Sequence, residues 1–177
     1  MRSWLSGVQA CAVIALAGCV ATSPTSQSSK GTEPRVHGPA PMATNTEAPD
    51  LGVLGPYGIP QGRCGMILYT LAGATPVPIF RSTDDGNALM DIEGAVTQIV
   101  LVGRKGETRM AIPSGQYFQG TLTSGGGVQV AAETQWGKEF RGGAYVERGT
   151  LTVTASDGWS RVVPVAGIAG CRALSQG

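Results

Sequence analysis

Glycine-containing turn sequences recur from Arg63 to the end of the chain, and this recurrence limits what the chain can fold into. The spacing of about ten residues suits short strands joined by tight hairpins, in which glycine supplies the positive φ that such turns need. The predicted turns are Asp85-Gly86-Asn87, Glu93-Gly94, Lys105-Gly106, Ser114-Gly115, Gly125-Gly126-Gly127, Arg141-Gly142-Gly143, Arg148-Gly149 and Asp157-Gly158.

The segments between these turns are short and apolar or alternate between apolar and polar residues. In residues 150–155 the threonines face one way and Leu151, Val153 and Ala155 the other, which is typical of a half-buried strand. Predicted strands are Cys64–Leu71, Val77–Arg81, Ala88–Ile92, Val96–Val102, Thr108–Ile112, Tyr117–Thr123, Val128–Thr134, Gly143–Glu147, Thr150–Ala155 and Ser160–Val165. The sequence therefore predicts an all-β fold, an antiparallel meander that forms a small barrel or sandwich.

The N-terminus has the pattern of a secretory signal, with Arg2 followed by an apolar run from Leu5 to Gly18. That run is shorter than the roughly 20 residues that cross a bilayer. It ends in Leu16-Ala17-Gly18-Cys19, which resembles the lipobox of bacterial lipoproteins. The resemblance implies a signal peptide at residues 1–18, cleavage before Cys19, and acylation of Cys19, for example by palmitate. An ordinary secretory signal is the alternative.

The residue after Cys19 is Val20 rather than Asp. By resemblance to known lipoprotein sorting, this favours the outer membrane, with the protein facing the periplasm. Residues 19–62 are rich in Ser, Thr, Pro, Ala and Gly, a composition typical of a disordered tether. Within the tether, Leu51 to Pro60 is more apolar, and we expect it to pack along the domain as an extended arm. The β domain is predicted to span residues 63–177.

Four cysteines occur, at positions 11, 19, 64 and 171. The first lies in the signal peptide and the second is assigned to lipid, which leaves Cys64 and Cys171 in the domain. In an oxidising compartment these two are expected to form a disulfide, which would tie the first strand to the last. A reactive thiol is the alternative, and it requires a neighbouring base or positive charge.

Charge and histidine content exclude several classes of function. From Arg63 onward the chain has ten Lys or Arg and nine Asp or Glu, so the basic face typical of nucleic-acid binding is not expected. The single histidine, His37, lies in the predicted tether, so the domain lacks a histidine for a catalytic triad or a zinc site. No cofactor is predicted. A hydrolase that uses carboxylates alone, such as Asp91 and Glu93, stays as a minor alternative.

Two short segments resemble motifs of the membrane-bound C-type lysozyme inhibitor family. Ser114-Gly115-Gln116-Tyr117 is similar to its Ser-Gly-x-x-Tyr loop, with Tyr117 one residue early and Phe118 at the family position. Trp136-Gly137-Lys138 matches the start of its Trp-x-Lys-Gly motif, with Glu139 in place of the final glycine. Members of this family are small β-barrel lipoproteins with a disulfide that joins the two ends of the barrel.

The resemblance implies that Ser114, Tyr117, Trp136 and Lys138 bind a partner. In the family, the serine and the lysine reach into the lysozyme cleft and occupy its catalytic carboxylates. The alternative is that Ser114 lies in a hairpin turn and that Trp136 anchors the core.

The sequence thus predicts a non-enzymatic cell-envelope lipoprotein that binds a protein or peptidoglycan partner in the periplasm. A lysozyme inhibitor is the sharper alternative. A flat rim with exposed aromatic residues would favour binding, whereas a deep cleft with two acids would favour a hydrolase. The aromatic candidates are Tyr57, Tyr117, Trp136, Tyr145 and Trp159.

Overall fold

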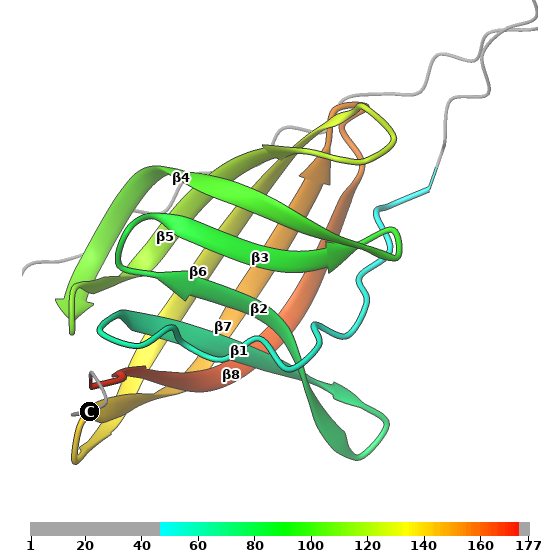
Figure 1. Cartoon of the computed structure of the whole chain (residues 1–177). Coiled ribbons are helices and arrows are strands. Elements are labelled where there is room, and N and C mark those ends of the chain that lie inside the picture. Colours follow the sequence, from blue (N-terminus) through cyan, green and yellow to red (C-terminus); the bar gives the residue numbers. More distant parts are fainter. Residues whose placement is uncertain (1–46, 174–177) are drawn as a thin grey trace, which may run out of the picture. The chain divides into compact units, whose positions relative to one another are not determined.

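The structure, a computed structural model, describes residues 47–173, in which eight antiparallel strands follow one another around a closed barrel (Figure 1). The strands are β1 (Cys64–Ala72), β2 (Thr75–Thr83), β3 (Asn87–Ile92), β4 (Ala95–Arg109), β5 (Ile112–Thr121), β6 (Gly127–Phe140), β7 (Gly143–Ala155) and β8 (Ser160–Cys171). The predicted all-β meander is confirmed, and it forms a barrel rather than a sandwich. Within residues 47–173 there is no helix long and apolar enough to cross a bilayer.

The barrel closes where β1 pairs with β8, from Cys64 opposite Cys171 to Tyr69 opposite Ala166. Cys64 and Cys171 form a disulfide across this pair, which confirms the bridge predicted from the sequence. We call the end of the barrel that carries the bridge the disulfide end. It also carries the β2–β3, β4–β5 and β6–β7 turns, and the other four turns lie at the opposite end, which we call the arm end.

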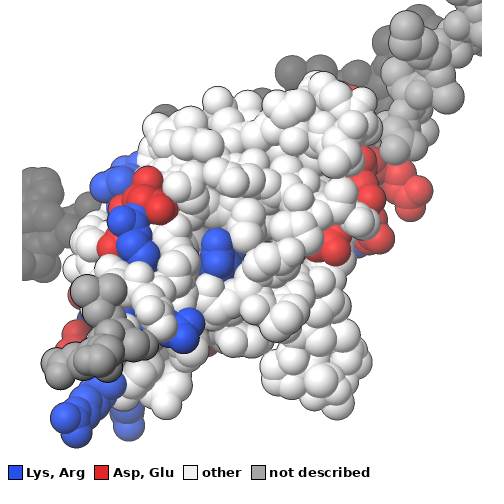
Figure 2. All heavy atoms as spheres, viewed as in Figure 1, with Lys and Arg blue, Asp and Glu red and all other residues white. Residues whose placement is uncertain are grey.

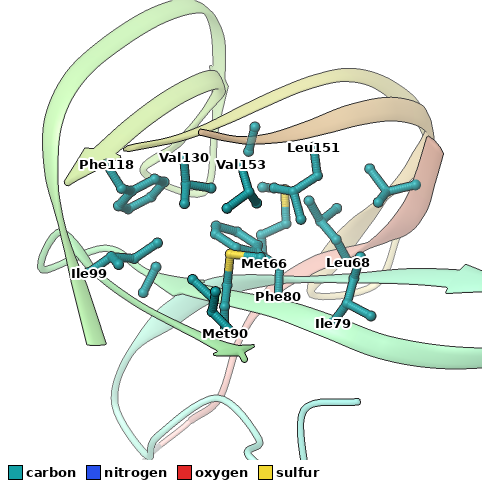
Figure 3. Packing of buried hydrophobic residues seen from close by; sticks show 14 of the residues in the cluster. Met66, Leu68, Ile79, Phe80, Met90, Ile99, Phe118, Val130, Leu151 and Val153 are labelled. Carbon is teal, nitrogen blue, oxygen red and sulfur yellow. The ribbon is translucent and has the colours of Figure 1, made fainter. Parts of the chain in front are cut away.

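Side chains that point inward alternate along each strand with side chains that point outward, and the inward ones fill the interior with apolar groups (Figure 3). In β7, Leu151 and Val153 are fully buried, as their spacing in the sequence predicts. Phe80 and Phe118 meet edge to face inside the barrel, with ring centroids 5.6 Å apart and an interplanar angle of 67°. The barrel interior is therefore a packed core and not a ligand cavity.

Three of the predicted turns are wrong, because the structure places them inside long strands. Lys105-Gly106 lies within β4, Ser114-Gly115 within β5 and Arg148-Gly149 within β7. The pairing register shifts between Lys105 and Thr108, and again between Val146 and Gly149, so extra residues are accommodated there as bulges. The predicted strands Gly143–Glu147 and Thr150–Ala155 are consequently one strand, β7.

The β4–β5 turn falls at Met110-Ala111, inside the predicted strand Thr108–Ile112, and that prediction is wrong as well. Both residues have positive φ, 47° and 63°, as in the hairpin turns that usually contain Asn-Gly. Neither residue is glycine, so the sequence carries no turn signal here. Met110 packs against the core, and this burial offsets part of the cost of the left-handed conformation, about 1–2 kcal/mol per residue.

An arm formed by residues 49–62 lies along the outside of the barrel (Figure 1). The arm starts at the arm end, where Leu51 bridges Ile92 on β3. Leu54 is buried to 1% exposure, and its N–H donates to the carbonyl of Pro78 at 2.7 Å. The expected packing of Leu51 to Pro60 is confirmed, so the folded domain includes an arm from the segment that the sequence assigns to the tether. Residues 19–46 lie outside the described residues.

Candidate functional site

The four binding residues predicted from the sequence lie on two neighbouring strands, β5 and β6. Ser114 is the third residue of β5, close to the disulfide end, and it lies within the strand instead of in a hairpin turn. The Thr134 hydroxyl of β6 donates to the Ser114 carbonyl at 2.9 Å. Lys138 follows Thr134 by four residues, which places the backbones of Ser114 and Lys138 up to about 13 Å apart along the same edge.

Lys138 is exposed, and within residues 47–173 it forms no ion pair or hydrogen bond. Its ammonium is thus available to a partner without loss of an internal contact. An uncommitted lysine of this kind binds an anionic group as a point charge.

Tyr117 belongs to an exposed cluster with Lys105 and Glu133 on three adjacent strands. The Tyr117 hydroxyl donates to Glu133 Oε1 at 2.8 Å, and the Lys105 ammonium pairs with the same oxygen. Lys105 Nζ also lies 5.2 Å from the centroid of the Tyr117 ring. The hydrogen bond from Lys105, followed by that from Tyr117, lowers the pKa of Glu133, and the Glu133 contact raises the pKa of Lys105. The Tyr117 hydroxyl is therefore already occupied within the chain.

Trp136 is partly buried and packs against the core near the disulfide end. Its indole N–H donates to the carbonyl of Glu107 at 3.1 Å, and the Arg109 guanidinium lies 5.9 Å from the Trp136 ring. Arg109 also donates to the carbonyl of Gly137 at 3.1 Å. These contacts give Trp136 an anchoring position between β4 and β6, with only part of the ring open to a partner.

The other aromatic candidates are more exposed but lie in separate places. Tyr57 is on the arm, Tyr145 is on β7 beside Phe140, and Trp159 precedes β8 at the arm end. The Phe140 and Tyr145 rings have centroids 4.9 Å apart. Phe140, the last residue of β6, and Tyr145, near the start of β7, thus form an exposed aromatic pair at the disulfide end.

A hollow of about 580 Å³ opens at the disulfide end between the β4–β5 and β6–β7 turns. Two of its lining residues are acids, Glu107 and Glu139, and both pair with Arg109, at 2.8 and 3.5 Å. The two side chains are 60% and 71% exposed. The two acids thus share one guanidinium at the exposed rim of the hollow.

The carboxylates considered from the sequence, Asp91 and Glu93, do not form a two-acid site. Asp91 lies beneath the arm. Its carboxyl group is so close to Gly52 of the arm that a Cβ at Gly52 would collide with it. Glu93 lies in the β3–β4 turn with φ of 56° and does not continue the strand, so the two side chains do not share a face. No group of three metal-binding side chains forms anywhere in residues 47–173.

The arm end is mainly acidic, and Figure 2 shows acidic groups gathered there and basic groups mixed with acidic ones toward the disulfide end. Basic residues toward the disulfide end are Arg63, Arg104, Lys105, Arg109, Lys138, Arg141 and Arg172. Acidic residues toward the arm end are Asp50, Asp91, Glu93 and Asp157. The separation of charge is partial, because Asp84, Asp85, Glu107 and Glu139 also lie toward the disulfide end and Arg161 lies toward the arm end.

Some of the basic residues at the disulfide end are neutralised within the chain. Arg63 pairs with Asp84 and Asp85, both at 2.8 Å. Burial alone would raise the pKa of Asp85, but hydrogen bonds from Thr83 and Asn87, together with the nearby Arg63, lower it. By contrast, Lys138, Arg141 and Arg172 form no ion pair among residues 47–173.

Comparison of the chain with protein-family models, with curated proteins and with solved structures found no match. The arrangement at the disulfide end must therefore be interpreted from its own chemistry. Sequence reasoning missed Arg109, Phe140, Arg141 and Arg172 as members of this region. Phe140 and Arg141 lie at the predicted Arg141-Gly142-Gly143 turn and Arg172 directly follows Cys171, but such positions do not reveal which turns meet in space.

Proposed function

We propose that the protein is a non-enzymatic lipoprotein of the cell envelope whose barrel binds a protein or peptidoglycan partner in the periplasm. The observation that carries this proposal is the group of uncommitted cations at the disulfide end, beside an exposed aromatic pair. Arginine and aromatic side chains are enriched in binding hot spots, and those that lack internal partners lose little when they bind. The filled barrel offers no enclosed substrate site, which also supports a role in surface binding.

The position of the arm supports the same assignment. The arm joins the barrel at the acidic arm end, where the N–H of Glu93 donates to the carbonyl of Asp50 at 2.9 Å. An anchored domain is thus held from its arm end, which leaves the disulfide end, on the opposite side of the barrel, open to a partner in the periplasm.

The lipid anchor is tested by metabolic labelling with a palmitate analogue. We expect the wild-type chain to incorporate the label and Cys19→Ala to lose essentially all of it, because Cys19 is the residue that the lipobox assigns to acylation. Cys11→Ala is the matched control, since that cysteine precedes the cleavage site, and it should label normally. Incorporation by Cys19→Ala would refute the lipoprotein assignment.

A lysozyme inhibitor is the second candidate, favoured by the location of Ser114 and Lys138 at one edge of a disulfide-closed barrel. An ammonium and a hydroxyl presented together satisfy two buried carboxylates through charge-assisted hydrogen bonds. In this form of the proposal, Ser114 and Lys138 enter the lysozyme cleft, and Tyr117 and Trp136 support the edge.

We test this candidate by titrating a panel of lysozyme types with the full chain. Inhibition of one type at equal stoichiometry is expected, and Lys138→Ala should weaken it at least about tenfold, as for a hot-spot residue. Arg148→Ala removes an equal charge from an exposed position on β7 and should leave inhibition unchanged. If no lysozyme type is inhibited, the inhibitor candidate is rejected. The broader binding proposal is tested separately, by photocrosslinking in the cells that make the protein.

A further inference from the structure

A second hollow, of about 300 Å³, lies on the outer wall of the barrel over the seam between β1 and β8. We call it the seam pocket. Its apolar walls are Ile59 from the arm, Ile67 from β1, Ile168 from β8 and Phe140 from the end of β6. Arg141 and Arg172 also line it. The seam pocket shares none of the four binding residues predicted from the sequence.

Glycines form the floor of the seam pocket, and their lack of side chains is required. A Cβ at Gly65 would collide with the side chain of Ile59 and with the carbonyl of Ser82. A Cβ at Gly170 would lie 2.9 Å from the carbonyl oxygen of Gly142. Glycine at these two positions therefore lets the arm and the β6–β7 turn approach the seam closely, and these two segments border the hollow.

The arm and the disulfide fix the edge of the seam pocket. The N–H of Gly62 donates to the carbonyl of Arg172 at 2.7 Å, and the N–H of Arg172 donates to the carbonyl of Arg63 at 2.9 Å. Arg172 directly follows the bridged Cys171. Its backbone is thus held in place before any ligand arrives, which reduces the entropy lost on binding.

The apolar side chains around the seam pocket form a continuous strip across three strands. Ile168 pairs across β1–β8 with Ile67 and across β7–β8 with Tyr145. Phe140, Tyr145 and Ile168 are 40%, 51% and 39% exposed. With strands about 4.8 Å apart, the strip is roughly 10 Å long, which matches three residues of an extended peptide.

The charges at the seam pocket are all positive. Arg141 and Arg172 have no carboxylate partner among residues 47–173, and the Arg172 guanidinium donates only a long 3.4 Å hydrogen bond to the carbonyl of Ile59. No acidic residue lines the seam pocket. Glu139, which lies near the same turn, is paired with Arg109. Guanidinium groups bind carboxylates with two parallel hydrogen bonds.

We propose that the seam pocket binds a peptide segment of a protein partner in which a carboxylate stands next to a large apolar side chain. The apolar side chain fills the hollow between Ile67, Ile168 and Phe140, and the carboxylate pairs with Arg141 or Arg172. A membrane surface fits less well, because polybasic lipid recognition uses clusters of four to eight basic residues, whereas two line the seam pocket.

This inference deepens the proposed binding function, because it names the chemistry of the partner. It concerns different residues from Ser114 and Lys138, so each site can fail while the other holds. The hollow is at the small end of the range for ligand sites, about 300–1,000 Å³, so affinity for an isolated peptide is expected to be modest.

The test uses the full chain in phosphatidylcholine nanodiscs, labelled with ¹³C at the isoleucine methyl groups. Eight acetylated and amidated tetrapeptides, which combine Leu, Ile, Phe or Trp with Asp or Glu, are titrated against it. We expect saturable shifts at Ile59, Ile67 and Ile168 with at least one peptide. The core residues Ile79, Ile92, Ile99 and Ile112 provide the internal control and should not shift.

The charge requirement is tested with the same spectra. The Asn or Gln analogue of the best peptide should bind about tenfold more weakly. Arg141→Gln and Arg172→Gln should each weaken binding of the acidic peptide about two- to fivefold, as for exposed ion pairs. Arg104→Gln removes the same charge from β4, four strands from β8 in the barrel order, and should leave binding unchanged.

Three results would overturn the inference. The first is no shift at the three isoleucines with any of the eight peptides. The second is equal weakening by Arg104→Gln, which indicates non-specific attraction. The third is a shift of the same methyl groups caused by peptidoglycan fragments or by nanodiscs with phosphatidylglycerol, in the absence of peptide. Lys138→Ala should retain peptide binding, so failure of the predicted β5–β6 site is distinguishable from failure of the seam pocket.

Discussion

Removal of the Cys64–Cys171 bridge is expected to lower the free energy of unfolding by about 4–5 kcal/mol. The bridge joins residues 107 positions apart, so it removes a large part of the conformational freedom of the unfolded chain. In the folded state it holds β1 against β8, the pairing that closes the barrel. A loss of this size is a large fraction of the stability of a small domain, typically 5–15 kcal/mol.

The measurement is urea denaturation of wild type and of Cys64→Ser combined with Cys171→Ser, followed by tryptophan fluorescence. The corresponding double alanine variant is the control, because an equal loss shows that the missing bridge and not the new hydroxyl groups is responsible. Wild type treated with reductant should lose the same amount, and this comparison holds even if the variants fold poorly. A loss below about 1 kcal/mol would show that the closure of the barrel does not depend on the bridge.

Truncation of Phe80 has the second large expected effect. Phe80→Ala should cost about 3–5 kcal/mol, because the side chain is fully buried and its removal leaves a cavity in the centre of the barrel. Phe80 also meets Phe118 edge to face. Thermal or urea denaturation measures the loss directly, and Phe80→Leu, which retains most of the volume, should lose less than about 1.5 kcal/mol.

Phe140→Ala is the matched control for this prediction. Phe140 is the same residue type but is 40% exposed, so its removal should change the unfolding free energy by less than about 1 kcal/mol. A double-mutant cycle of Phe80 and Phe118 should give a coupling of about 0.5–1.5 kcal/mol. Equal losses from Phe80→Ala and Phe140→Ala would contradict a core centred on the Phe80–Phe118 pair.

The architecture was predictable from the sequence because strand alternation and most hairpin turns are local signals. The pattern of residues 150–155 identified the buried face of β7 correctly, and turns such as Asp157-Gly158 were placed correctly. The turn predicted at Arg148-Gly149 is wrong because a glycine is also required where a neighbouring backbone comes close. A Cβ there would lie 2.7 Å from the carbonyl oxygen of Glu133, a contact that depends on the pairing of β6 with β7.

The site was less predictable, because its members meet only when three turns converge at the disulfide end. Trp136 looked like a binding aromatic, yet its indole N–H is held by Glu107, 29 residues earlier in the chain. Tyr117 is similarly occupied by Glu133. The residues left without internal partners, among them Lys138 and Arg141, could be recognised only after the ion pairs of their neighbours were assigned.

The proposed function places the partner at the disulfide end of the barrel. Site-specific photocrosslinking in the cells that make the protein tests it most directly. A photoreactive p-benzoylphenylalanine replaces Glu139, an exposed residue at the disulfide end, in one variant and Thr123, in the β5–β6 turn at the arm end, in the other. We expect an adduct of defined mass, dependent on ultraviolet light, from position 139 and none from position 123. An adduct from position 123 alone, or no adduct from position 139, would refute binding at the disulfide end.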